Sequence, residues 1–388
     1  MIIRLTTTDV AHGGWCVGRH EDRVVFVSGA LPHETVDVEI TSQRSKMWYG
    51  RTVAIQESSP DRVPHIWPLA EATSVGGVNL GHVSLSAQHQ WKASVINTQM
   101  RRLAQLDTRV EVEPAPGDQD RRGLRWRTRL DLSVNAQGRL AMNCAHSHDV
   151  VAIDGMPLAH EDIISELHHD ITRRHPQGTR RYVYASDSGL LVTQETSPAI
   201  VREKVATSLG TWSFEVDGWG FFQVHREAPK VLLEAVIDAV GESWDSLLDL
   251  YSGVGLLAIP LAEVTGARVT AVEIETRASQ LLSRNARTSD VEVRTGDARI
   301  AMTAMAPGQY EVVVCDPPRA GLKRESVNQI AGLRPELVVY VACDPASLAR
   351  DVGFFHSHGY ELTRLRAFDL FPMTHHVECV AVLANTTG

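Results

Sequence analysis

Apolar and charged residues alternate along the first part of the chain. The segment Glu34–Ile40 has the two-residue period of a half-buried strand, and the apolar run Val24–Val27 leads into a turn with Gly29 and Pro32. Short strands separated by Gly and Pro turns predict a small β-barrel over residues 1–56.

The next segment changes from a loop pattern to a helical one. Residues 57–82 contain several prolines and a Gly-Gly pair, which are typical of loops. From Ser84 to about Leu106, apolar residues recur near the helical spacing. We therefore expect residues 57–107 to form a linker and a helix that packs on the C-terminal domain.

Residues 108–218 combine strand and helix patterns, and we expect them to form a central mixed α+β domain. Leu130–Val134 and Arg139–Met142 flank a turn with Asn and Gly, which predicts a hairpin. In residues 219–388 apolar strands alternate with helical stretches, which predicts an α/β fold with a parallel sheet covered by helices on both faces. The candidate strands of that sheet are Leu247–Tyr251, Arg268–Glu273, Glu311–Cys315, Leu337–Val341 and Val380–Leu383.

Composition excludes several classes of protein. With 388 residues, 43% of them hydrophobic and 22% charged, the chain is typical of a globular protein of two or three domains. No apolar run approaches the about 20 residues that span a bilayer, and the first residues lack the apolar stretch of a signal peptide. The five cysteines are scattered and form no C-x-x-C pair, which argues against disulfides and against a zinc or iron–sulfur site. We expect a cytoplasmic monomer with no membrane partner.

One segment of this acidic chain, whose formal net charge is −9, is strongly basic. If it forms a strand, Arg125, Arg127 and Arg129 point the same way. Such a stripe could bind RNA phosphates, with Trp126 stacked on a base. A solvated strand face is the alternative, and we predict RNA contact because the rest of the chain is acidic.

A glycine-containing loop follows the first strand of the α/β region. Gly253 and Gly255 permit a tight turn and close approach of the backbone to a ligand. Glu273 ends the next strand, where a carboxylate can accept hydrogen bonds from ribose hydroxyls. The spacing also fits a dinucleotide-binding fingerprint, so this loop alone leaves NAD and S-adenosylmethionine open.

Two later acidic residues favour S-adenosylmethionine. Asp297 follows the expected third strand, where methyltransferases place an acidic residue near the adenine. Asp316 follows the fourth strand, at the edge where open α/β sheets bind ligands. An aromatic residue in place of Arg319 would favour amino-group methylation, so the arginine argues against it.

A thiol and a carboxylate lie beside the last two strands. Cys343 closely follows one apolar strand, and Glu378 directly precedes the last one. A thiol nucleophile with a carboxylate base is what methylation of an unactivated pyrimidine carbon requires. A buried structural thiol and a surface carboxylate are the alternatives, and Cys315 and Cys379 fit the structural role.

Over nearly its whole length the chain resembles the RNA 5-methyluridine (uracil-C5) methyltransferase family. The separation of Cys343 and Glu378 is similar to the family's spacing between nucleophile and base. The segments that carry the resemblance are Gly13–Arg19, which is typical of a TRAM domain, and Phe221–His225, Asp249–Gly255, Asp316–Gly321, Cys343–Asp351 and Asp369–Glu378. The resemblance implies a Rossmann-like class I S-adenosylmethionine methyltransferase domain, an OB-like RNA-binding barrel and a central RNA-binding insert.

The resemblance also implies roles for individual residues. S-adenosylmethionine would be the cofactor, Cys343 the nucleophile and Glu378 the base. Asp316 would also contact the uracil edge, and Arg319 would hold the enolate oxygen or a phosphate. The residues expected to line the cofactor site are Gln223, Tyr251, Gly253, Gly255, Glu273, Asp297 and Asp316.

This chain departs from the family pattern in three places. His225 replaces the usual Asn, and Leu256 replaces a frequent Asn or Thr, so we expect one cofactor contact to be missing. Some members carry a four-cysteine iron–sulfur cluster between the barrel and the first helix. The matching stretch, His65–His82, contains no cysteine, so we expect no cluster and no other metal.

The implied reaction is methylation of carbon 5 of a uridine in structured RNA, either rRNA or tRNA. An RNA 5-methylcytosine methyltransferase is an alternative, but that class places a second cysteine after a proline in the fourth-strand motif, where this chain has Asp316-Pro317-Pro318-Arg319. A non-catalytic RNA-binding protein with a relic methyltransferase fold is also compatible with the sequence. A nicotinamide dehydrogenase is a more distant candidate.

Overall fold

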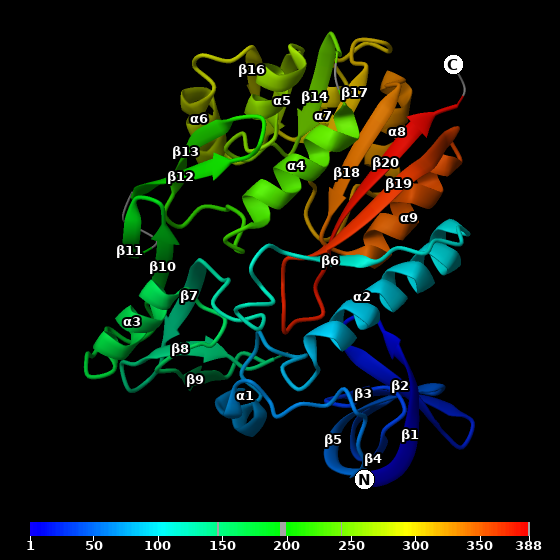
Figure 1. Ribbon diagram of the computed structural model, residues 1–388, viewed down its shortest axis with the longest axis vertical. Coiled ribbons are helices and arrows are strands. Elements are labelled where there is room, and N and C mark those ends of the chain that lie inside the picture. Colours follow the sequence, from blue (N-terminus) through cyan, green and yellow to red (C-terminus); the bar gives the residue numbers. More distant parts are fainter. Residues whose placement is uncertain (146, 195–198, 242, 387–388) are drawn as a thin grey trace.

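The computed structural model describes residues 1–145, 147–194, 199–241 and 243–386 (Figure 1). Its N-terminal part is a closed five-stranded barrel in the order β1-β2-β3-β5-β4, which confirms the predicted barrel. Alternate residues such as Val25, Val27, Val36 and Val38 fill its interior. The strands are β1 (Ile2–Ala11), β2 (Trp15–His20), β3 (Arg23–Ser28), β4 (Thr35–Gln43) and β5 (Met47–Glu57).

A long helix lies between the barrel and the last strands of the chain (Figure 1). After the short α1 (Pro68–Thr73), α2 (Leu85–Gln99) begins at Ser84, whose side chain accepts a hydrogen bond from the backbone N–H of Ala87. A π-helical turn, η1 (Met100–Ala104), continues it. The predicted helix from Ser84 to about Leu106 is therefore confirmed.

The central region contains a five-stranded sheet in the order β11-β10-β7-β8-β9. The antiparallel pairing of β7 with β8 confirms the predicted hairpin. A second hairpin, β12 with β13, packs on the hydrophobic core of the C-terminal region. The elements are β7 (Arg129–Val134), β8 (Leu140–Asn143), β9 (Val150–Ala152), α3 (Glu161–Asp170), β10 (Arg180–Ser186), β11 (Gly189–Thr193), β12 (Ile200–Ala206) and β13 (Thr211–Asp217).

The predicted arginine stripe is wrong. Strand β7 begins only at Arg129, and Arg125 has a positive φ of 57°, so the three arginines do not share a strand face. The guanidinium of Arg127 donates to the backbone carbonyl of Arg129, and that of Arg129 lies 4.1 Å from the centre of the Tyr184 ring. Trp126 is fully buried and cannot stack on a base.

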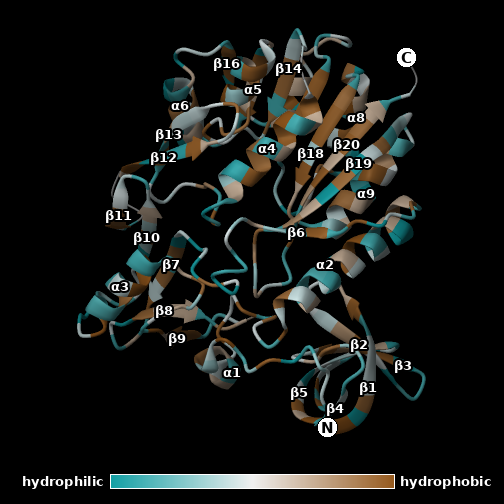
Figure 2. Cartoon of the chain, viewed as in Figure 1, coloured by the Kyte–Doolittle hydropathy of each residue, from teal (hydrophilic) through white to brown (hydrophobic). Residues whose placement is uncertain are grey.

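The C-terminal region is built on an eight-stranded sheet in the order β16-β15-β14-β17-β18-β20-β19-β6. Hydrophobic residues concentrate in its strands (Figure 2). The first five strands are parallel as predicted, but β20 is antiparallel to both neighbours, which corrects the prediction of a fully parallel sheet. The strands are β6 (Val112–Pro114), β14 (Ser246–Leu250), β15 (Arg268–Glu273), β16 (Val291–Thr295), β17 (Val312–Cys315), β18 (Leu337–Ala342), β19 (Tyr360–Asp369) and β20 (Glu378–Asn385).

Helices cover both faces of this sheet. One face packs on α4 (Ala228–Val240), α5 (Ala258–Thr265) and α6 (Thr276–Asn285). The other packs on α2, α7 (Ala298–Met302), α8 (Lys323–Leu333) and α9 (Pro345–His356). Among the described helices, none is both long and apolar enough to cross a membrane.

A buried ion pair ties the barrel to the linker that follows it. The carboxylate of Glu34, which is completely buried, accepts hydrogen bonds from the Arg62 guanidinium at 2.6 and 2.7 Å and from the backbone N–H groups of Leu31 and Ser59. Burial alone would raise the pKa of Glu34, but these donors outweigh it and hold the pKa below its usual value. The pair therefore stabilises the fold above the unfolded-state pKa of Glu34, and this contribution is lost as the pH falls through the lowered folded-state pKa.

We predict that Arg62→Met lowers the free energy of unfolding by about 3–5 kcal/mol, because it leaves a buried carboxylate without its cation. The exposed pair Arg51–Glu39 of the same barrel provides the control, since Arg51→Met should cost less than about 1 kcal/mol. Urea unfolding of both variants measures the difference. Equal losses of unfolding free energy in the two variants would contradict the stabilising role assigned to the buried Arg62–Glu34 pair.

Candidate active site

The predicted functional residues gather at one edge of the eight-stranded sheet. Glu273 ends β15, Tyr251 follows β14, Asp316 follows β17 and Cys343 follows β18. These four strands are parallel, so their carboxyl ends meet at the same edge. Strand β20 runs the opposite way and begins there with Glu378.

The pairing of β18 with β20 brings Cys343 and Glu378 together. The antiparallel register runs without a shift from Leu337 opposite Ala384 to Ala342 opposite Cys379. One further step of this register puts Cys343 opposite Glu378. Cβ atoms of directly opposite residues lie about 4.5–5.5 Å apart, so the thiol and the carboxylate are neighbours.

Negative charge and burial oppose ionisation of the Cys343 thiol. Burial raises its pKa to about 12, with further contributions from the carboxylates of Glu378 and Asp316, while Arg319 acts in the opposite direction. The thiol is therefore neutral in the unliganded protein. Cys315 and Cys379 are fully buried inside the sheet, as predicted for structural thiols.

The two carboxyl groups beside the thiol also favour their protonated forms. Burial raises the pKa of Asp316 to about 7. Burial raises the pKa of Glu378 well above its ordinary value, the charge of Asp316 raises it further, and Arg319 opposes both. Oε2 of Glu378 is buried and accepts no hydrogen bond from any described residue, so it is free to take a proton.

Two histidines lie in the loop before Glu378. His375 accepts a hydrogen bond from the amide of Asn79 at 2.7 Å, and Nε2 of His376 lies 3.4 Å from the guanidinium of Arg319. Burial lowers the pKa of His375 to about 4 and that of His376 to about 3. Both rings are therefore neutral near pH 7, which favours a structural role over phosphate binding.

The glycine loop has the geometry of a ligand-binding turn. Gly253 has a positive φ of 56°, and its backbone N–H donates to Oε2 of Glu273 at 2.8 Å. A Cβ on Gly253 would meet no atom within 4 Å, so this side of the loop is open. At Gly255, by contrast, a Cβ would lie 2.5 Å from Leu282, and φ is 98°, so glycine is needed there for close packing.

A third buried carboxyl group, Asp249, lies beside these residues, although it is not among the residues predicted to bind the cofactor. It lies in β14 and is almost completely buried, and burial together with the charges of Asp316 and Glu273 raises its pKa to about 8. Its Oδ2 atom accepts no hydrogen bond from any described residue. Its one sequence signal is its position directly before the glycine loop.

One expected cofactor residue, Asp297, and both residues that depart from the family pattern have partners within the protein. Asp297 caps α7 by accepting from the backbone N–H of Arg299 at 2.8 Å. Leu256, where a cofactor contact was expected to be missing, is half-buried and packs on the hydrophobic core. Nε2 of His225 lies 2.9 Å from Oδ2 of Asp118, and its Nδ1 accepts from the backbone N–H of Glu227, so this ring joins the start of α4 to the loop before β7.

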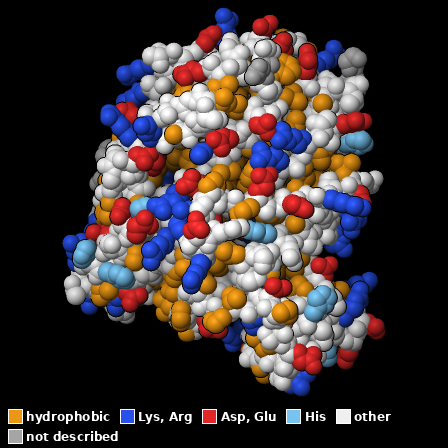
Figure 3. All heavy atoms as spheres, viewed as in Figure 1, with side chains coloured by type: hydrophobic (Ala, Val, Ile, Leu, Met, Phe, Trp, Pro, Cys, Tyr) orange, Lys and Arg blue, Asp and Glu red, His pale blue; other side chains and the backbone are white. Residues whose placement is uncertain are grey.

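Gln223 lines a cavity of about 370 Å³ between the central region and α4. Basic side chains gather where these parts meet in Figure 3. Lys204, Arg226 and Lys230 line the cavity, together with the acidic Asp187 and Glu203. The expected contact of Gln223 with the cofactor stays a prediction.

The stretch His65–His82, which matches the iron–sulfur segment of some relatives, is packed with apolar side chains. Trp67, Val75 and Val78 are buried in one cluster with Met156. Within the described residues, no group of three or more His, Cys, Asp or Glu side chains is arranged to hold a metal ion. The absence of a cluster stays a prediction.

Comparison with known proteins agrees with this geometry. Residues 2–53 match the TRAM domain model, residues 227–331 the methyltransferase small domain, and residues 282–386 the model described as tRNA (Uracil-5-)-methyltransferase. An RNA methyltransferase of Bifidobacterium longum is 38% identical, and the match covers 97% of this chain and 95% of that protein. The chain belongs to the RNA uracil-C5 methyltransferase family. Another RNA methyltransferase, from Streptomyces avermitilis, is 34% identical over 96% of both proteins.

A solved structure shares the fold of this uracil-C5 methyltransferase family member. The tRNA (uracil-54, C5)-methyltransferase of Pyrococcus abyssi, crystallised with S-adenosyl-L-homocysteine, superimposes with a TM-score of 0.72. The match covers 98% of this chain and 100% of that one, at 21% sequence identity. The resemblance stated from sequence is thus confirmed at the level of family and fold.

The crowded carboxyl groups make the reactivity of Cys343 testable in this family member. We predict that Glu378→Gln lowers the pKa of the Cys343 thiol, because it removes a neighbouring negative charge, and so speeds alkylation by iodoacetamide at pH 9. The rate should rise about tenfold for each unit by which the pKa falls. Mass spectrometry measures the rate at Cys343, with the half-buried Cys144 as internal control. An unchanged rate at Cys343 would show that Glu378 places no negative charge beside the thiol.

Proposed function

We propose that this protein transfers a methyl group from S-adenosylmethionine to carbon 5 of a uridine in structured RNA. The observation that carries the proposal is the register of β18 and β20, which aligns Cys343 with Glu378 beside Asp316. A nucleophile, a base and a third carboxyl group at the ligand-binding edge of an α/β sheet are the groups that this reaction uses.

The charges of the site favour a cationic ligand. Glu273 and Asp316 lie close enough to Asp249 for their charges to raise its pKa. S-adenosylmethionine supplies an electrophilic methyl group on a positively charged sulfur, and a cation relieves the repulsion among three carboxylates. The anionic pyrophosphate of NAD would increase this repulsion, which argues against a nicotinamide dehydrogenase.

The Cys343 thiol must lose its proton, which passes to solvent, before it reacts. The positive charge of Arg319 opposes the raised pKa of this thiol, and a bound cation next to Asp316 would bring the pKa down further. The sulfur of Cys343 then bonds to carbon 6 of the uracil and moves an electron pair toward O4, which makes carbon 5 nucleophilic. We assign to Asp316 and Arg319 the binding of the uracil edge and of the developing negative oxygen.

Glu378 completes the reaction as the base. Carbon 5 bonds to the methyl carbon as the bond from that carbon to the sulfonium sulfur breaks, and S-adenosylhomocysteine is the leaving group. Oε2 of the ionised Glu378 then takes the proton from carbon 5. The electron pair of the broken C–H bond re-forms the double bond between carbons 5 and 6, and the Cys343 sulfur leaves as a thiolate. The raised pKa of Glu378 makes its carboxylate a stronger base than an exposed one.

Methylation of cytosine has less support. The residue after Pro317-Pro318 is Arg319, and the neighbouring Cys315 is fully buried in the sheet. Burial raises the pKa of Cys315 well above its ordinary value, so it is not a reactive thiol. Cys343 is thus the only described cysteine at this edge that can act as the nucleophile.

The outer surface of the barrel is a second part of the proposed RNA site. The half-exposed rings of Trp15 and Phe26 lie 5.4 and 5.2 Å from the ring of Tyr49, and Arg44 lies over Tyr49. Aromatic rings with arginines suit single-stranded RNA, because bases stack on the rings and phosphates bind the cations. His12, in the turn before Trp15, contacts the carboxylate of Asp344 at 2.7 Å, so this surface adjoins the Cys343 turn.

Covalent trapping tests the proposed reaction. With S-adenosylmethionine and RNA that contains 5-fluorouridine, the wild-type protein should form a denaturant-stable adduct, because fluorine blocks the final proton removal. Cys343→Ala should form none, and Glu378→Gln should still form it, since the base acts after the addition. The adduct is detected by denaturing gel electrophoresis, with tRNA and rRNA transcripts in separate reactions.

The absence of any adduct with either RNA, from protein that binds S-adenosylmethionine in calorimetry, would contradict the proposal. That result would favour a non-catalytic RNA-binding protein. An adduct that persists in Cys343→Ala would instead assign the nucleophile to another residue.

The barrel surface makes a separate prediction. Tyr49→Ala should weaken RNA binding about fivefold to 150-fold, which is the loss of one stacked base. Tyr49→Phe keeps the ring and should bind RNA like the wild type. Fluorescence anisotropy with the trapped transcript measures both affinities, and equal losses in the two variants would exclude stacking as the role of Tyr49.

A further inference from the structure

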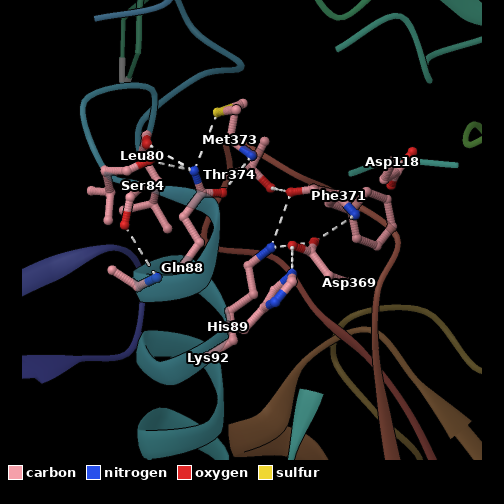
Figure 4. Close-up of polar contacts among 12 residues, drawn as sticks. Leu80, Ser84, Gln88, His89, Lys92, Asp118, Asp369, Phe371, Met373 and Thr374 are labelled. Carbon is pink, nitrogen blue, oxygen red and sulfur yellow. Dashed lines mark hydrogen bonds and ion pairs between the residues drawn. The ribbon is translucent and has the colours of Figure 1, made fainter. Parts of the chain in front are cut away.

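The strand that carries the proposed base begins directly after a loop with no regular secondary structure. Residues 370–377 connect β19 to β20, and Glu378 pairs with Phe368 directly after this loop. The strand pairing sets the backbone position of Glu378, and the way the loop is held bears on the direction of its carboxylate. Figure 4 shows that side chains of α2 hold it, although α2 lies far away in the sequence.

The first contact fixes the middle of the loop. Met373 has a positive φ of 66°, which residues with side chains rarely adopt. Its backbone N–H donates to Oε1 of Gln88 at 2.7 Å, and its carbonyl accepts from the backbone N–H of Leu80 at 2.9 Å. Both backbone polar groups of the unusual residue are thus bonded to the segment around α2.

Gln88 is itself fixed at both ends of its amide. Its side chain is fully buried, and Nε2 donates to the backbone carbonyls of Val83 at 2.8 Å and Leu80 at 3.3 Å. The orientation of the amide is therefore determined, with Oε1 directed at Met373 (Figure 4). A residue whose only role was to fill space in the core would not need hydrogen bonds at both ends of its side-chain amide.

The second contact fixes the start of the loop. The ammonium group of the buried Lys92 donates to Oδ1 of Asp369 at 2.5 Å and to the carbonyl of Phe371 at 3.1 Å. Oδ1 of Asp369 also accepts from the backbone N–H of Phe371, and His89 contacts Oδ2 at 3.2 Å. The ion pair lies one residue beyond Phe368, the partner of Glu378.

The nucleophile is held by a separate set of contacts. Cys343 directly follows β18, and the next residue, Asp344, caps α9 by accepting from the backbone N–H of Ser347 at 2.8 Å. Neither Gln88 nor Lys92 takes part in these hydrogen bonds. A change in the α2 contacts should therefore move the base and leave the nucleophile in place.

We propose that Gln88 and Lys92 are positioning residues for Glu378. They hold residues 370–377 so that the carboxylate faces the proton on carbon 5, and they act on proton removal rather than on the addition of Cys343. This inference rests on the proposed function. It assigns to α2 a role in the removal of the proton from carbon 5.

Two changes with a matched control test the inference. Gln88→Met removes the acceptor for Met373, and the double change Lys92→Met with Asp369→Asn removes the ion pair without leaving an unpaired buried charge. Gln90→Met is the control, because it makes the same substitution on the exposed side of the same helix. The melting temperature of each variant is recorded beside its activity.

Each variant is assayed with 5-fluorouridine RNA and with ordinary RNA. We expect the rate of adduct formation with 5-fluorouridine RNA to stay within about threefold of wild type, and turnover of ordinary RNA to fall about tenfold to a hundredfold, as for a reacting group displaced by about 1 Å. With ordinary RNA, the methylated covalent adduct should then accumulate in the Gln88 and Lys92 variants. The wild type and Gln90→Met should resolve this adduct and release the methylated RNA. A purely structural role would lower adduct formation and turnover together.

The results separate this inference from the proposed function. If wild type forms the adduct and a folded Gln88→Met variant turns over normally or loses both rates equally, the positioning role is wrong and the proposed reaction stands. If Gln88→Met does not fold, the same criteria apply to the double variant, and loss of folding in both assigns these residues to stability instead. If wild type forms no adduct, the proposed function fails.

Discussion

The antiparallel insertion of β20 between β18 and β19 is the constraint on which the site depends. A sixth parallel strand would have ended at this edge, and Glu378, as its first residue, would lie at the opposite edge, far from Cys343. Because β20 runs the other way, its first residue lies where β18 ends. The backbone ladder thus sets the separation of nucleophile and base before any side-chain contact contributes.

This arrangement brings several acidic groups into a small buried volume, with physical consequences for the chemistry. Cys343, Glu378 and Asp316 all have raised pKa values because burial disfavours their charged forms, and neighbouring carboxylates raise the pKa values of Cys343 and Glu378 further. Near pH 7 the Cys343 thiol therefore keeps its proton, while Asp316, with a pKa of about 7, is partly ionised. In the proposed reaction, positive charge from Arg319 and from the cationic methyl donor would lower the pKa of the Cys343 thiol and so activate it.

Much of the fold and the site could be predicted from the sequence, for identifiable reasons. The barrel, the hairpin of β7 and β8 and the five parallel strands follow from local periodicity and turn residues. Cys343 and Glu378 can be found because strand ends carry them. The direction of β20 could not be predicted, since a buried apolar run is the same in both directions. The arginine stripe is wrong because Arg125 adopts a positive φ, which alternation does not reveal.

The contacts of α2 could not be predicted from the sequence either, and they connect separate parts of the molecule. Lys92 and Asp369 are each ordinary charged residues in sequence, and only the tertiary structure buries them together. A buried lysine is costly unless it is paired, so the pair requires one relative position of α2 and the β19–β20 loop. The same helix packs on the barrel through Trp91 and Val95. The barrel that we propose to bind RNA is therefore connected through α2 to the loop before the proposed base, and through the contact of His12 with Asp344 to the turn of the proposed nucleophile.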